Sequence, residues 1–190
     1  MDHPRRSVLA LAVLSMLTEE PMHAYRMQQL IKERRKDDVV NVSQRNSVYQ
    51  TIQRLTRDGL VEAGRTERND NRPERTTYHI TDAGRGTLRA WLADMLSAPT
   101  REYAEFPAAL SFLPNLSPKE VVEALVARVT RLEQQLAALD DEIAEVGRFL
   151  PRLFAIESEY QRQIVGAELA YVRGLIDDVR AKRLTWPSSR

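Results

Sequence analysis

No cysteine occurs among the 190 residues of this chain. Disulfide bonds and thiolate metal sites are therefore excluded, and the composition fits a protein of the reducing cytoplasm. The chain has 3 histidines, His3, His23 and His79, which stand far apart and lack the spacing of metal ligands. We therefore expect no metal site.

Motifs for catalysis are also missing. The sequence contains no nucleophile motif, no glycine-rich phosphate loop and no isolated pair of acids in an apolar setting. The acidic run Asp140–Glu142 lies in a heptad segment, where consecutive helical residues point in different directions, so it is interpreted as a solvated face. We expect that the protein is not an enzyme and needs no cofactor.

No apolar run is long enough to cross a bilayer. Near the start, Arg5 and Arg6 precede the apolar stretch Val8–Leu17, an arrangement that resembles a signal peptide. No small-residue cleavage site follows it, and the stretch is too short for a transmembrane helix. We predict a buried first helix and no membrane partner.

Charge is balanced overall but not along the chain. Residues 1–98 carry 16 Lys and Arg against 13 Asp and Glu, whereas residues 99–190 carry 12 against 14. The bias is mild, so a case for nucleic acid depends on where the charges are placed. With 43% hydrophobic residues the chain can bury a core, and its length allows two small domains, expected at residues 1–98 and 99–190.

One predicted helix has almost no acid on its polar face. The segment Ser43–Leu60 has apolar residues at helical spacing, at Val48, Ile52 and Leu55. Its other side carries amides, hydroxyls and guanidiniums without Asp or Glu before Asp58, and Gly59 can supply the left-handed residue that ends the helix. Such a face suits DNA, because Asn and Gln pair with adenine and Arg pairs with guanine. A polar surface helix is the alternative interpretation.

The flanking segments predict a winged helix-turn-helix. Helices over Arg6–Thr18 and His23–Lys36 precede this helix, and strands over Leu60–Arg68 and Glu74–Ile80 follow it. The turn between the strands is flanked by arginines: Arg65, Arg68, Arg72 and Arg75. These charges favour a DNA-binding wing over a hairpin that only covers the core.

The C-terminal half predicts helices that pair. A helix over Asp82–Ser97 and a short one near Pro107–Pro114 precede a capping box, Ser117 to Glu120, which starts a long helix. Apolar residues then recur three and four apart, as in a coiled coil: Val122, Leu125, Val129, Leu132, Leu136, Leu139, Ile143, Val146 and Leu150. A last helix, about Arg152–Arg183, is apolar on two sides. We predict that this coiled-coil-like region makes a dimer.

Four motifs then point to a family. They are Met22–Tyr25; Ser47–Tyr49 with Leu55 and Asp58–Val61; Arg72–Pro73 with Tyr78; and Ile80–Arg85. In this order and spacing they resemble the PadR family of winged-helix transcriptional regulators, in its larger subclass with a long helical C-terminal region. The chain departs from that pattern at Ala24, where the family has glycine, and at Thr76–Thr77, where it has a basic-aromatic pair.

The resemblance implies a mainly α-helical protein: a winged helix that binds operator DNA, followed by a helical dimerisation region. It also implies repression that a small molecule relieves, and a contact of Tyr49 with the DNA backbone. The DNA-binding residues expected from the helix and the wing are Gln44, Arg45, Ser47, Tyr49, Gln50, Arg54, Arg72 and Arg75.

Two alternatives stay open. Trp91 lies at apolar helical spacing, which is typical of a core residue, but in some PadR-like proteins an aromatic near this place stacks on a flat ligand. The domain as a whole has a second interpretation as a winged-helix module that binds protein and not DNA. The partners expected under the first interpretation are double-stranded operator DNA, a second copy of the chain and a small aromatic or hydrophobic effector.

Overall fold

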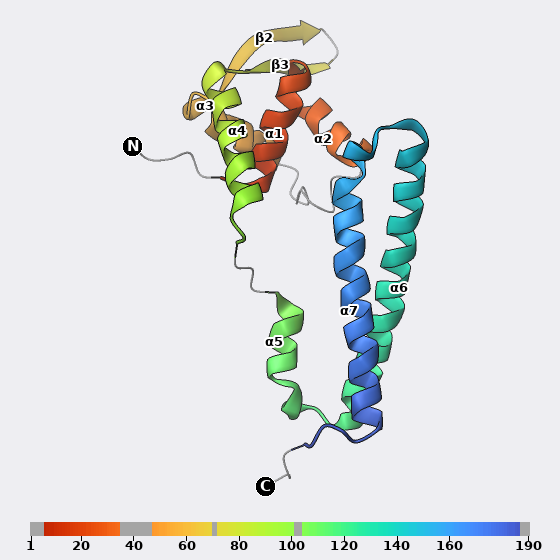
Figure 1. Ribbon diagram of the computed structural model, residues 1–190. Helices are drawn as coiled ribbons and strands as arrows, with labels where there is room; N and C mark the ends of the chain where they lie inside the picture. Colours follow the sequence, from red (N-terminus) through yellow and green to blue (C-terminus); the bar gives the residue numbers. More distant parts are fainter. Residues whose placement is uncertain (1–5, 35–46, 70–71, 101–103, 187–190) are drawn as a thin grey trace. The chain divides into compact units, whose positions relative to one another are not determined.

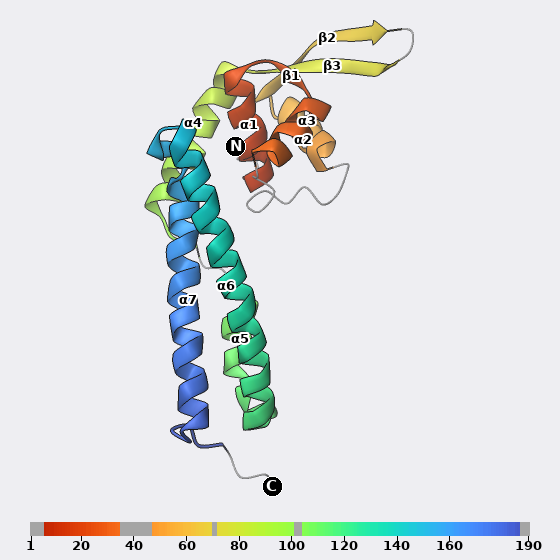
Figure 2. The same ribbon diagram turned by 90° about the vertical axis from the view of Figure 1, so that its right-hand side faces the viewer.

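The computed structural model describes residues 6–34, 47–69, 72–100 and 104–186, and only the backbone at residues 67–69 and 72–75. The described chain is mainly α-helical with one small antiparallel sheet, which confirms the predicted fold class (Figures 1 and 2). It divides into two compact units, residues 1–101 and 102–190. No described helix is long and apolar enough to cross a membrane.

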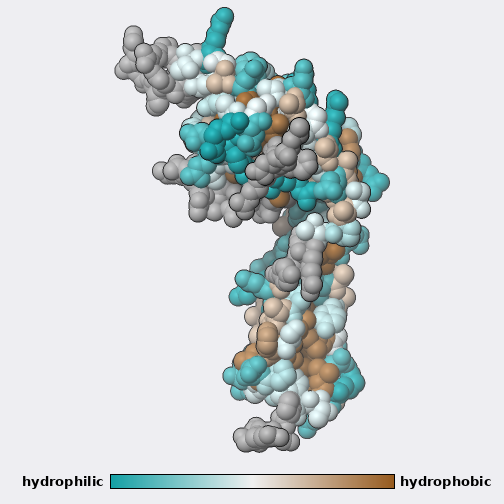
Figure 3. All heavy atoms as spheres, turned by 90° about the vertical axis from the view of Figure 1, so that its left-hand side faces the viewer, coloured by the Kyte–Doolittle hydropathy of each residue, from teal (hydrophilic) through white to brown (hydrophobic). Residues whose placement is uncertain are grey.

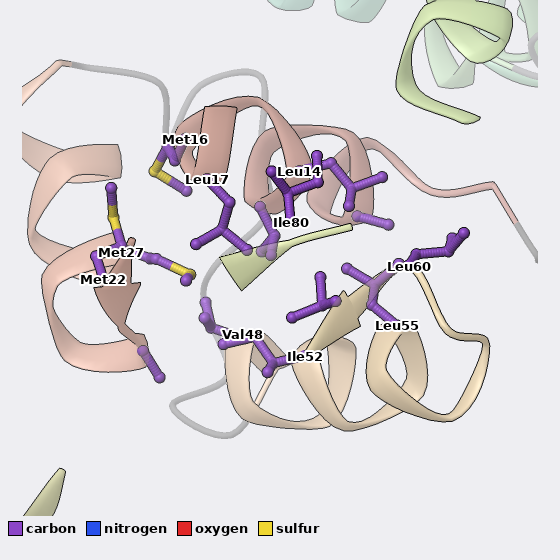
Figure 4. Close-up of a cluster of buried hydrophobic side chains, with 14 of the residues drawn as sticks. Leu14, Met16, Leu17, Met22, Met27, Val48, Ile52, Leu55, Leu60 and Ile80 are labelled. Carbon is purple, nitrogen blue, oxygen red and sulfur yellow. The ribbon is translucent and has the colours of Figure 1, made fainter. Parts of the chain in front are cut away.

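Three helices build the core of the first unit: α1 (Val8–Glu19), α2 (Ala24–Glu33) and α3 (Ser47–Arg57). Figure 4 shows side chains from all three, among them Leu14, Met27 and Ile52, meeting in one apolar cluster. The nearly wholly apolar sequence of α1 is explained by its place against both α3 and the fourth helix, since a helix with two neighbours buries two sides.

Capping side chains decide where the first two helices begin. The Ser7 hydroxyl accepts a hydrogen bond from the Ala10 amide at 3.1 Å, so α1 begins at Val8 and not at Arg6. The His23 Nδ1 atom accepts from the Arg26 amide at 3.0 Å, so α2 begins one residue later than predicted. Arg6, expected to begin α1, precedes its N-cap, and His23, expected to begin α2, is itself the N-cap.

A three-stranded antiparallel sheet lies beside these helices, in the order β1-β3-β2. The predicted hairpin is present as β2 (Val61–Asn69) and β3 (Arg72–Ile80), with Ala63 opposite Tyr78 and Thr66 opposite Thr76. A strand that was not predicted, β1 (Met22–His23), pairs with β3. Two residues are too few to show the alternation that identifies a strand in a sequence.

A tight junction joins α3, the sheet and α4 (Asp82–Ser97). The α3 helix ends at Arg57, and Gly59 just after it has the predicted left-handed conformation, with a φ of 71°. The Thr81 hydroxyl donates to the Gly59 carbonyl at 2.8 Å and accepts from the Gly84 amide at 3.0 Å, so one side chain caps α4 and holds it to the end of α3. A Cβ atom at Gly84 would lie 2.1 Å from the Leu60 carbonyl oxygen, so the close approach requires glycine.

The second unit is a helical hairpin with a short helix. After α5 (Glu105–Ser111) and η2 (Leu113–Asn115), the long helices α6 (Pro118–Phe149) and α7 (Ile156–Arg180) lie side by side, joined by η3 (Arg152–Phe154) (Figures 1 and 2). The predicted capping box is present: the Ser117 amide donates to Glu120 Oε2 at 2.8 Å, and Ser117 Oγ accepts from the Glu120 amide at 3.3 Å.

The apolar residues that recur three and four apart along α6, from Val122 to Leu150, were predicted to pair with another helix; we call them the seam of α6. Most of this seam packs against α7 of the same chain. Leu125, Leu132 and Leu139 are buried in a cluster with residues of α7, and Val122, Val129 and Leu136 pack partly against that cluster. Ile143 and Val146 are half-buried, and Leu150 is exposed. The periodicity of α6 is therefore explained largely by α7, and a role of these residues between chains stays a prediction.

Candidate nucleic-acid interface

The α3 helix has one buried and one exposed face. Its buried side consists of Val48, Thr51, Ile52 and Leu55, which face the core of the first unit. The opposite side is exposed to solvent and consists of Tyr49, Gln50, Gln53, Thr56 and Arg57. We call Tyr49, Gln50, Gln53 and Arg57 the outer face of α3. It carries a phenol, two amides and a guanidinium, all groups that hydrogen-bond to bases or phosphates, and no carboxylate.

The predicted DNA-binding residues of this helix divide into four groups. Tyr49, of which 46% is exposed, and Gln50 lie on the outer face. Ser47 is half-buried at the first position of α3. Arg54 is half-buried on the flank of the helix, where its Nη2 atom donates to the Ser7 hydroxyl at 3.1 Å. Gln44 and Arg45 lie outside the described residues.

Two residues of the outer face were not among the predicted site residues. Gln53 and Arg57 are exposed on α3, on the same side as Tyr49 and Gln50. Gln53 follows Gln50 by three residues and Arg57 follows Gln53 by four. This spacing was the signal that could have identified them, because residues at these intervals share a helical face.

The wing supplies a second surface. Arg72 and Arg75 lie in β3, where Arg72 pairs with Asn69 and Arg75 with Glu67; the structure describes their backbone and not their side chains. At Thr66 and Thr76 the two hydroxyls are 3.1 Å apart and form a cross-strand hydrogen bond. Thr76 is the first of the two residues that replace the basic-aromatic pair of the family. Its hydrogen bond to Thr66 stabilises the hairpin.

Trp91 is half-buried and packs against the core of the first unit. Its neighbours on the predicted apolar face of α4 differ: Leu88 is buried, whereas Leu92, Met95 and Leu96 are exposed, with 88% of Leu96 in contact with solvent. The first unit alone therefore covers only the start of this face.

Among the described residues no group of three or more His, Asp or Glu could hold a metal ion.

An open groove of about 620 Å³ lies in the second unit between α5, α6 and α7. Phe106, Leu110 and Tyr171 give it apolar walls. On one side Arg128 lies over the Phe106 ring, 3.7 Å from its centre, and its Nε atom donates to Glu168 at 2.6 Å. The groove thus combines aromatic surface with a charged pair, and the sequence pattern did not indicate it, since its residues come from three separate helices.

Comparison with known proteins identifies the first unit. The sequence model of the transcriptional regulator PadR-like family matches residues 13–90, from α1 into α4. No curated protein matches the chain.

Solved structures share the fold over nearly the whole chain. PadR of Bacillus subtilis in complex with operator DNA has a TM-score of 0.72 at 19% identity, covering 91% of this chain and 99% of PadR. The same protein in complex with p-coumaric acid has a TM-score of 0.74 at 17% identity, with coverages of 92% and 99%. A PadR-like regulator of Bacillus cereus has a TM-score of 0.62 at 15% identity, with the same coverages. At these identities the likeness establishes the fold. The family match, which covers residues 13–90, shows that this part of the chain, the winged helix, is of the PadR-like family.

Proposed function

We propose that this protein is a cytoplasmic, homodimeric repressor that binds a pseudo-palindromic operator in double-stranded DNA and is released by a small aromatic or hydrophobic effector. The observation that carries this proposal is the outer face of α3, which is exposed, free of carboxylates and set beside a wing. The likeness of fold to a regulator solved with operator DNA supports it.

In this proposal the helix reads bases and the wing anchors the domain. The amides of Gln50 and Gln53 and the guanidinium of Arg57 can hydrogen-bond to base edges when α3 lies in the major groove. Gln44 and Arg45, which precede α3, would contact the same groove, since the N-terminal part of a recognition helix enters it. Tyr49, Arg72 and Arg75 would bind phosphates, which position the protein without reading sequence.

The dimer would use the side of α7 that faces away from α6. Its residues Ile156, Tyr160 and Ile164 recur along one side of the helix and are all at least half exposed. We call them the outer stripe of α7. Figure 3 shows further hydrophobic surface on the second unit, where charged residues would be expected in a monomer. The exposed end of the predicted seam, at Leu150, would extend this surface.

Two recognition helices are required for a specific site. One α3 helix reads only a few base pairs, which is too little information to find a site in a genome. Joining two makes the second contact intramolecular and can raise affinity by roughly 10²–10⁴-fold. The two helices would then lie about 34–36 Å apart, one turn of DNA, on a rough palindrome.

The effector would be a planar aromatic molecule with a polar group. The groove lined by Phe106, Leu110 and Tyr171 offers apolar surface, and the Arg128–Glu168 pair offers a donor and an acceptor at its side. The complex of the Bacillus subtilis relative with p-coumaric acid supports this chemical class. Trp91 stays the second candidate for the effector contact.

In vitro selection of DNA from a random pool tests the proposal directly. Enrichment of one rough palindrome, bound by the full chain with steep loss of affinity as salt rises, is the expected result. A protein-binding winged helix would enrich no sequence and would elute early from heparin. Adding p-coumaric acid and related phenolic acids to the complex in a gel shift then tests the effector, which should release the DNA.

A further inference from the structure

The guanidinium of Arg54 is turned into the protein. Its Nη2 atom donates to the Ser7 hydroxyl at 3.1 Å, and its Nε atom is buried without a hydrogen-bond partner among the described residues. None of the ion pairs between described residues includes it. The neighbouring cation Arg57, one turn along α3, is exposed instead.

The acceptor of this hydrogen bond is itself fixed. Ser7 caps α1, and its hydroxyl oxygen also accepts from the Ala10 amide at 3.1 Å. The preceding residue, Arg6, forms an ion pair with Asp94 of α4. The start of α1 is therefore held to α4 by one residue and to α3 by the next, and α1 packs against both helices.

This arrangement contributes little to stability. The guanidinium is partly removed from water and lacks a carboxylate among the described residues, which is unfavourable. The N-terminus of α1 opposes its charge whereas the last turn of α3, to which Arg54 belongs, favours it, so the two helix dipoles offset each other. Hydrophobic replacement of such groups is often neutral for folding. A hydrogen bond with a fixed acceptor instead restricts the rotation of α3 about its axis, and that rotation decides where the outer face of α3 points.

We propose that Arg54 is a positioning residue, which sets the rotation of α3 through Ser7 so that Tyr49, Gln50, Gln53 and Arg57 face the DNA. This proposal differs from the expected role of Arg54 as a direct DNA contact, which stays a prediction, and it rests on the proposed DNA-binding function. Sites of recognition need their contact groups held to within about 0.5 Å, so a small rotation of α3 would weaken base contacts and spare phosphate contacts made from the wing.

The test compares Arg54→Ala with Arg57→Ala on the selected operator and on random DNA over a range of salt. Arg54→Ala should lower the preference for operator over random DNA by about tenfold, which corresponds to one misplaced base contact. It should leave unchanged the salt slope, by which we mean the fall in the logarithm of DNA affinity with the logarithm of salt concentration. A group that neutralises one phosphate contributes about 0.9 to that slope. Arg57→Ala serves as the matched exposed cation on the same helix.

Four further variants separate positioning from folding. Ser7→Ala should lower the operator preference as Arg54→Ala does, and the double variant should lose no more than the worse single one, because both changes break one contact. Ser7→Thr keeps the hydroxyl and should restore the preference. Arg54→Lys keeps the charge but not the planar donor, so it should lose preference at an unchanged salt slope even if Arg54→Ala folds poorly.

Several outcomes would overturn the assignment. A fall in salt slope for Arg54→Ala, an additive double variant, or an Arg54→Lys protein with full operator preference would each show that the guanidinium binds DNA directly or does not matter. A wild-type protein without operator preference would refute the proposed function, and the role of Arg54 with it. Refutation of the Arg54 role alone requires a wild type that prefers the operator.

Discussion

At the scale of single residues, the functional assignment depends on which side of α3 each side chain occupies. Gln50 and Gln53 are exposed, Val48 and Ile52 are fully buried, and Arg54 lies between them on the flank. A helix turns by about 100° per residue, so residues next to each other in the sequence of α3 point to different sides, into the core, into solvent or along the flank.

Base reading and phosphate anchoring should be separable by mutation. Gln50→Ala should reduce operator affinity by roughly 1–3 kcal/mol and relax preference at one base pair in each half-site, because it removes one amide contact. Arg72→Ala should weaken binding to all DNA about equally and lower the salt slope by about one unit. Titrations on operator and random DNA at several salt concentrations measure both effects.

The control for these variants is Gln135→Ala, which removes an exposed amide from α6. It should leave DNA binding unchanged. Identical behaviour of Gln50→Ala and Arg72→Ala across operator and random DNA would contradict the division between helix and wing.

Trp91 tests whether an aromatic of α4 is structural. Because it packs against the core but is only half-buried, Trp91→Ala should destabilise the first unit by less than the roughly 3–5 kcal/mol of a fully buried tryptophan. Urea denaturation measures this loss. Leu96→Ala, on the same helix and exposed, should change stability by no more than about 0.5 kcal/mol.

A ligand role for Trp91 has a different signature. The chain has two tryptophans, and Trp186 donates to the Leu116 carbonyl at 2.7 Å in the second unit, so the measurement belongs in a Trp186→Phe background. Quenching of the remaining fluorescence by phenolic acids, together with an unchanged stability of Trp91→Ala, would assign Trp91 to the effector.

At the scale of elements, the end of α3 and the start of α4 behave as one piece. Thr81 connects them through its hydroxyl, and its amide donates to the Leu60 carbonyl at 3.1 Å. The same carbonyl oxygen lies against Gly84. We infer from these contacts that a movement of α4 would displace the helix that we propose reads DNA.

Two glycines of α4 provide a matched pair of substitutions. Gly84→Ala places a Cβ against the backbone of Leu60, which cannot move aside easily, so it should destabilise the first unit by about 1–3 kcal/mol or more. Gly86→Ala meets no atom within 4 Å and should stabilise α4 by about 0.5–1 kcal/mol, because alanine favours a helix. In thermal and in urea denaturation the midpoint should therefore fall for Gly84→Ala and rise for Gly86→Ala. Equal shifts of the two variants would contradict the close approach at Gly84.

At the scale of the whole molecule, the second unit contains two apolar surfaces that differ in exposure. The surface between α6 and α7, with Leu132 and Leu169, is closed within the chain. The outer stripe of α7, with Tyr160 68% exposed, has no cover among the described residues of its own unit. We infer that the first surface stabilises the hairpin and that the second joins two copies.

Charged substitutions should distinguish the two surfaces. Tyr160→Glu with Ile164→Glu should leave the helices folded but convert a dimer into a monomer, since the glutamates stay in water unless a second copy covers them. Leu132→Glu should unfold the hairpin, because it buries a charge without a partner. Analytical ultracentrifugation and circular dichroism separate these results.

Ala127→Glu is the charge control, since Ala127 is exposed on α6. It should change neither the fold nor the mass of the particle. A Tyr160→Glu, Ile164→Glu protein that stayed dimeric and kept its operator affinity would show that the dimer forms elsewhere.

Local signals in the sequence determined the helices, the hairpin and the motifs of the PadR-like family, because caps, turns and periodicity act over a few residues. Ser117 with Glu120 and the glycine at position 59 are examples in which the predicted contact is present. The sequence also indicated that the polar side of α3 is free of carboxylates.

Only the tertiary structure decided which partner each apolar or charged side chain has. Periodicity shows that Leu125 and Leu132 share a face of α6 but not whether the covering helix comes from the same chain. Likewise the sequence predicts Arg54 as a DNA contact but cannot show that its guanidinium donates to Ser7, 47 residues earlier. Both questions concern residues far apart in the chain, and their answers come from packing, which no local pattern encodes.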